Sequence, residues 1–346
     1  MYCAKTRTLP VWASLAAIVI VTMISSPLLA DEKLEIWPRF SFDEMLTDNL
    51  PQQTRRNSGG DAISIFAVGG TATLDSTSRT LGLDYVTDAQ VYARHSHFDQ
   101  AFQDQYLGLR DYERLTPLTG LSLNDTFING QQAFGQSLVG SSEATPLLSQ
   151  ALLQNNFLTN TFNAELNHKF SGRLTTLFDV HQTFFSGSSS GQTSESFNQG
   201  AELTAYYSLS PRLSLGPDFQ FNDFRFSNEP RADSYQPSFA VKMNWTEHLH
   251  SWLTIGPLII SSPNGTSEDV GYIFGTSYKG ERSLLQVFSG RSPSISAGTS
   301  GASVSQYEGA AAGYWLTRHT IAYINGSFIQ FPNYQQQLWC PLWWRD

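Results

Sequence analysis

A long two-residue alternation over Asn155–Phe185 constrains the fold of this chain more than any other part of its sequence. On its first arm the even positions are mostly apolar and the odd positions polar, and the alternation resumes after Ser171-Gly172-Arg173. Leu177 and Phe185 are the exceptions on the second arm. A side-chain period of two is the pattern of a strand with one apolar and one polar face. The stretch therefore predicts two strands joined by a tight turn.

The length of these arms narrows the fold further. Each arm runs for about 14 residues, whereas strands of soluble domains average about 5–6. A tilted strand needs about 9–11 residues to cross a bilayer. Long arms with one apolar and one polar face predict a hairpin of a membrane barrel.

The same pattern recurs along the chain. Tight turns are expected near Gly172, Pro211, His248, Gly280 and Arg318, at intervals of roughly 32–39 residues. Polar loops are expected between them, at 186–196, 227–234, 261–269 and 289–301, and a further long loop is expected before the first of these turns, at 135–150. We therefore predict an all-β fold, a transmembrane antiparallel up-and-down β-barrel of about 12–14 strands with long extracellular loops and short periplasmic turns. A secreted soluble β-protein, such as a propeller or β-solenoid, is the alternative, but its repeats need shorter strands.

The N-terminus has the features of a secretory signal peptide, residues 1–30. Lys5 and Arg7 precede the short apolar run Val11–Met23, and cleavage is expected after Ala30. No later stretch approaches 18 uninterrupted apolar residues, so a membrane-spanning chain would have to cross with strands. The predicted location is the outer membrane of a Gram-negative envelope.

Charge and cysteine content exclude other classes. The formal net charge is −9, and removal of Lys5 and Arg7 with the signal peptide makes it −11. Such a surface argues against a nucleic-acid partner. Because Cys3 leaves with the signal peptide, Cys340 cannot form an intrachain disulfide.

The remaining segments complete the expected domain organisation. Residues 31–60 are read as a periplasmic extension without strands, with a short helix near Phe42–Leu50. Residues 61–331 are the barrel, whose first hairpin is Ala62–Leu74 and Leu81–Ala93. Residues 332–346 are an atypical tail, because a final strand does not usually contain Pro341 or Trp343-Trp344. A truncated or frameshifted terminus and a short plug are both open.

The turn of the first hairpin predicts which polar residues face one another. A three-residue turn places Glu165 opposite Asp179 and Asn163 opposite His181 on the polar face. The expected lumen-lining residues are Asn163, Glu165, Asp179, His181 and Glu202. Opposed carboxylates could set ion selectivity or hold a cation. Ordinary solvated lumen residues in a shifted register are the alternative.

Catalytic signatures are missing from the sequence. It contains no G-x-S-x-G elbow and no H-E-x-x-H motif. His95-Ser96-His97 is a weak candidate for metal binding. We therefore expect no enzymatic activity, no cofactor and no metal site.

Three stretches resemble a known family: Leu118–Phe127, Phe157–Leu177 and Phe288–Phe331. They are similar to porin-like bacterial outer-membrane barrels found near exopolysaccharide and protein-sorting loci. The resemblance implies a barrel in a surface-polysaccharide context and brings no catalytic residues. The expected partners are outer-membrane lipid, the barrel assembly machinery and exopolysaccharide, and the oligomeric state stays open.

These observations predict a porin-like channel for small hydrophilic solutes or surface polysaccharide. The alternatives are a closed structural or adhesive barrel that contacts exopolysaccharide through its loops, and an outer-membrane enzyme.

Overall fold

A computed structural model describes most of the chain. The described residues are 33–47, 61–94, 100–130, 157–189, 192–227, 230–263, 265–295, 302–317, 321–330, 337–339 and 343–345. The expected signal peptide, the loop at 135–150 and the His95-Ser96-His97 motif lie outside these residues. No helix in the described ranges is long and apolar enough to span a membrane.

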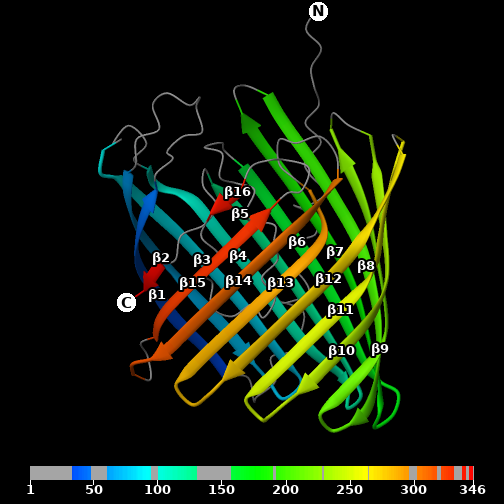
Figure 1. The fold of residues 1–346 in the computed structure, drawn as a ribbon. Helices are drawn as coiled ribbons and strands as arrows, with labels where there is room; N and C mark the ends of the chain where they lie inside the picture. The colour runs from blue at the N-terminus through cyan, green and yellow to red at the C-terminus, as the bar shows by residue number, and fades with distance from the viewer. Residues whose placement is uncertain are drawn as a thin grey trace, which may run out of the picture.

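Fifteen long strands, of 10 to 19 residues each, make up the described part of the chain. They are β1 (Lys33–Thr47), β2 (Asp61–Asp75), β3 (Arg79–Tyr92), β4 (Gln100–Thr116), β5 (Thr119–Gly130), β6 (Phe157–Lys169), β7 (Leu174–Ser189), β8 (Gln192–Ser210), β9 (Leu213–Phe226), β10 (Ala232–Asn244), β11 (Leu249–Ser262), β12 (Gly265–Lys279), β13 (Ser283–Ile295), β14 (Ala302–Trp315) and β15 (Ile321–Gln330). Each strand pairs antiparallel with the next one in the chain. Figure 1 shows this single sheet rolled into a barrel of steeply tilted strands, which confirms the predicted fold class.

The exposed face of this sheet is apolar and its buried face is polar, which is the reverse of the arrangement in a soluble protein. On β3, Asp84 is only 5% exposed, whereas its neighbours Leu83 and Tyr85 are 45% and 43% exposed. The same inversion recurs around the barrel, with large apolar side chains exposed on the outer face at Leu107, Leu166, Phe178, Leu203, Phe219, Phe239, Phe274 and Val287. Because a soluble domain buries such side chains, the alternation places the polar face inside the barrel.

The N-terminal strand corrects one expectation. Residues 33–47 were expected to form an extension without strands, yet β1 pairs with β2 along its whole length, from Lys33 opposite Asp75 to Thr47 opposite Asp61. Its apolar residues at Leu34, Ile36, Phe40 and Phe42 do alternate and are exposed, but Trp37-Pro38 interrupts the pattern. β2 to β15 account for fourteen strands within the expected barrel, and β1 adds one more.

Several expected loops are shorter than predicted. Residues 186–196 contain the end of β7 and the start of β8, which pair down to Ser189 opposite Gln192. β12 likewise begins at Gly265. The Ser- and Gly-rich composition indicated loops, but the ladder uses backbone groups, so these residues continue strands where a partner strand is in register.

The ends of the sheet meet near the C-terminus. Two short strands, β16 (Gln337–Trp339) and β17 (Trp343–Arg345), both pair with β15. β17 also contacts β1, and Figure 1 shows the C-terminus beside that strand. The tail that the sequence marked as atypical therefore contributes strands at the seam between β15 and β1.

Candidate functional site on the inner wall of the barrel

A row of polar side chains crosses six adjacent strands of the inner wall, and three of its members are carboxylates. Direct cross-strand partners on β5 to β10 are Ser122, Glu165, Asp179, Glu202, Gln220 and Gln236. Three consecutive members of this row, on β6, β7 and β8, are carboxylates. Directly opposed like charges repel and attract cations. We refer to Glu165, Asp179 and Glu202 as the acidic row.

A second polar row lies one step further along the same strands, toward the longer connections. Its members are Asn124, Asn163, His181, Gly200, Asn222 and Ser234. Apart from Gly200, every member can donate or accept hydrogen bonds with its side chain. The inner wall between β5 and β10 is therefore polar over two successive rows.

Asp179 links the two rows. It accepts a short hydrogen bond from Asn163 Nδ2, and its Oδ1 lies 3.1 Å from His181 Nδ1. The other ring nitrogen of His181, Nε2, lies 2.8 Å from Asn222 Oδ1, and Asn222 Nδ2 donates to Ser234 Oγ at 3.2 Å. The network therefore runs continuously from β6 to β10.

Gly200 leaves the space that the hydrogen bond between His181 and Asn222 needs. His181 on β7 reaches Asn222 on β9 across Gly200 of the intervening strand β8. A Cβ at Gly200 would lie 2.4 Å from His181 Nε2 and 2.6 Å from Asn222 Oδ1. Any larger residue would displace the imidazole.

The structure brings together all five residues singled out from the sequence. Glu165 lies opposite Asp179 and Asn163 opposite His181, in the register that a three-residue turn predicts. Glu202 lies opposite Asp179 on the other side. Reasoning from the sequence missed Asp218, which accepts a hydrogen bond of 2.7 Å from Thr204 Oγ1. Its two-residue spacing from Gln220, and that of Gln220 from Asn222, could have placed it on the same inner face.

On another part of the inner wall, arginine side chains balance the charge of a buried carboxylate. Asp84 on β3 binds Arg110 Nη2 at 2.7 Å and Thr71 Oγ1 at 2.6 Å, and Arg39 Nη1 lies 3.6 Å from it. Two guanidinium groups thus surround one carboxylate here. In the acidic row, by contrast, Asp179 lies 3.1 Å from His181 Nδ1, and Lys242 is the cation that interacts electrostatically with Glu165. The two sides of the wall therefore differ in charge.

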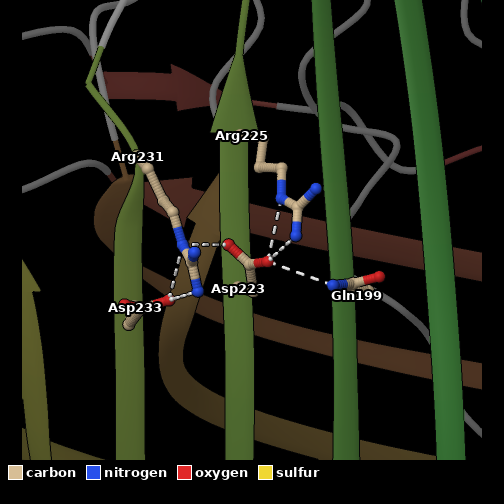
Figure 2. A network of polar contacts seen from close by, with 5 residues as sticks. All are labelled: Gln199, Asp223, Arg225, Arg231 and Asp233. Atoms are coloured by element: carbon tan, nitrogen blue, oxygen red, sulfur yellow. Dashed lines mark hydrogen bonds and ion pairs between the residues drawn. The ribbon is translucent and has the colours of Figure 1, made fainter.

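A further charge network lies on the outer face (Figure 2). Asp223 of β9 accepts bonds from Arg225 at 2.8 Å and from Gln199 of β8 at 3.0 Å, and Arg231 Nε lies 2.9 Å from it. These residues share the outward face with Phe219 and Phe221. Asp223 lies about 25 Å above Leu213 at the turn end, given about 3.3 Å per residue and a tilt of about 40°.

Within the described ranges, no group of three or more His, Cys, Asp or Glu residues is arranged to hold a metal ion.

Comparisons with known proteins give weak likenesses. No protein-family model matches the sequence, and no curated protein is significantly similar to it. An outer membrane channel from Pseudomonas putida F1 is 12% identical, with a TM-score of 0.40 over 72% of this chain and 95% of that one. A BenF-like porin from Pseudomonas fluorescens Pf-5 is 8% identical, with a TM-score of 0.37 over 92% and 97%.

A third structure of this kind is the ferric enterobactin receptor of Pseudomonas aeruginosa. It is 11% identical, with a TM-score of 0.42 over 88% of this chain and 54% of the receptor. Because all three scores are below 0.5, no property of these proteins is transferred to this chain.

Proposed function

We propose that this protein is an outer-membrane channel for small hydrophilic solutes and that it prefers cations. The observation that carries the proposal is the acidic row on a polar inner wall, enclosed by strands whose outer faces are apolar. A polar interior and a lipid-facing apolar band are the two requirements of a transmembrane barrel that conducts water-soluble solutes. Rings of Asp and Glu in a pore favour cations.

The height of the apolar band supports the membrane location. The outward residues of β9 are apolar from Leu213 to Phe221, and the next outward residue is the ion-paired Asp223. The distance of about 25 Å from Leu213 to Asp223 equals the usual height of the apolar band of an outer-membrane barrel. Three aromatic side chains on the outer face at the opposite strand ends, Tyr207, Trp245 and Tyr314, are exposed as an interfacial girdle would be.

Conductance of the refolded chain in planar bilayers tests the proposal. Stepwise currents and a reversal potential that favours cations are expected across a salt gradient. In the triple variant Glu165→Gln/Asp179→Asn/Glu202→Gln the cation preference should fall, because the charges of the row are removed while its size is kept. Currents with an unchanged reversal potential would refute the role of the acidic row.

A closed structural barrel is the second candidate. The observation that favours it is an apolar cluster of Phe224, Ala232, Leu258, Ile260 and Val304, all less than 10% exposed, toward the longer connections. Such a cluster could fill the barrel at that level. A β-rich, heat-modifiable protein that passes no current and binds exopolysaccharide would support this reading and would contradict the channel.

A further inference from the structure

Lys242 places a positive charge on the acidic side of the inner wall. It lies on the inner face of β10, toward the turn end of the strand, and its side chain is exposed. Its cross-strand partners are Ser214 on β9 and Trp252 on β11. The carboxylates at the described inward positions of β6 to β10 are Glu165, Asp179, Glu202 and Asp218. A fixed cation among them lowers the negative potential that a passing ion meets.

The ammonium group of Lys242 lies over an aromatic ring two strands away. Its Nζ is 4.3 Å from the ring centroid of Tyr206 on β8, within the range of a cation–π interaction. Tyr206 belongs to the inner face of β8, because its neighbour Tyr207 points outward and is exposed. The lysine side chain therefore runs along the wall from β10 to β8.

Small residues on β9 leave a path for this side chain. Ser214 lies opposite Lys242, and Gly216, the next inward residue, lies opposite Ala240. On the other side of Lys242, Trp252 leans toward β12, since a Cβ at Gly275 would overlap its indole ring. The inner wall thus directs the lysine toward Tyr206.

The ring keeps the ammonium group on the side of the wall that carries the carboxylates. Lys242 interacts electrostatically with Glu165. The inward residue next to Tyr206 on β8 is Thr204, whose hydroxyl donates to Asp218 at 2.7 Å. The charge of Lys242 and the mobile cations of the solution therefore respond to the same negative potential.

We propose that Lys242 is a specificity-determining residue of the channel, whose ammonium group, bound on the ring of Tyr206, offsets part of the acidic charge and limits the preference for cations. This inference rests on the proposed channel function. Rings of charged side chains set the selectivity of pores, so a single lysine among carboxylates weakens an acidic ring. Loss of the lysine should make the channel more selective for cations.

Reversal potentials in planar bilayers, measured across a gradient of potassium chloride, test this role. Lys242→Met removes the charge and keeps an unbranched side chain. It should raise the permeability ratio of potassium to chloride about threefold, which is the Coulomb effect of one charge at about 7 Å in water. Lys242→Arg should leave the ratio nearly unchanged. The matched control is Lys279→Met, which removes a lysine from the end of β12 and should change the ratio much less.

Tyr206→Leu tests whether the ring positions the ammonium group. In that background Lys242→Met should have a smaller effect on the permeability ratio, because the two changes remove the same arrangement. An undiminished effect would overturn the role of the ring. Heat-modifiable migration on gels checks that each variant has folded, and Lys242→Gln replaces Lys242→Met if the latter does not fold.

The outcomes separate this inference from the proposed function. Currents with equal permeability ratios in the unchanged chain and in Lys242→Met would overturn the inference alone. An equal change in Lys279→Met would do the same, because any lost lysine would then have the effect. Absence of current in the unchanged chain would overturn the proposed function and the inference with it.

Discussion

Asp223 and Asp233 lie directly opposite each other on the outer face of β9 and β10, and one guanidinium bridges them. Arg231 Nε lies 2.9 Å from Asp223 Oδ1, and its Nη2 lies 3.1 Å from Asp233 Oδ1. The side chain of Asp223 is 2% exposed while that of Arg231 is 57% exposed. The arginines therefore cover the carboxylate at the upper edge of the apolar band (Figure 2).

Removal of both covering arginines should destabilise the barrel. In Arg225→Ala/Arg231→Ala the Asp223 carboxylate loses its charged partners at a position where it is nearly inaccessible. We expect a loss of about 1–3 kcal/mol in the free energy of unfolding. Urea unfolding in lipid vesicles measures it. Arg173→Ala, which removes an arginine from the β6–β7 turn, is the control, and an equal loss in that variant would refute the explanation.

A charge on the outer face should cost more than the same charge inside. Phe178→Lys places an ammonium on the apolar band, where lysine costs about 2–4 kcal/mol at the bilayer midplane and less near its edges. Ser122→Lys places it beside Glu165 on the inner wall. Folding yield into vesicles should fall for the first variant and stay nearly unchanged for the second. The reverse order would contradict the orientation of the two faces.

The glycine under His181 should resist substitution. In Gly200→Ala the new methyl group would clash with His181 Nε2 and Asn222 Oδ1, so the His181–Asn222 hydrogen bond should break. Overpacking of this kind costs about 1–3 kcal/mol. Gly172→Ala is the matched control, because its Cβ would meet nothing within 4 Å. Thermal unfolding followed by circular dichroism compares the two, and equal midpoints would contradict the clash.

The C-terminal tail should stabilise the seam of the barrel. Deletion of residues 332–346 removes β16 and β17, which pair with β15, and with them the contact between β17 and β1. The unpaired edge of β15 would then be exposed. We expect a lower temperature for the loss of heat-modifiable migration on gels. An unchanged temperature would show that the tail adds nothing to closure.

Local alternation was sufficient to predict the central hairpin and its register. Glu165 lies opposite Asp179 because Phe170 faces Leu174 across the three residues Ser171, Gly172 and Arg173, so the pairing follows from counting along the sequence. The same reasoning placed Glu202 on the inner face. Alternation alone did not predict β1, because Trp37-Pro38 interrupts the pattern there. The strand is evident only from its pairing with β2.

The sequence by itself determined which side chains face the interior, because a strand alternates its faces whatever lies beside it. Where a turn does not set the register between two strands, only the tertiary structure decided which inward-facing side chains lie opposite each other. Asp88 and Asp104 face each other across a connection of several residues and beside a bulge, and neither feature can be counted from the sequence. From the sequence alone, Asp223 is a single charge on the lipid-facing side of β9. In the tertiary structure Arg231, which lies just before β10, forms an ion pair with it. In both places the partner is set by backbone pairing between strands, which residue order alone does not specify.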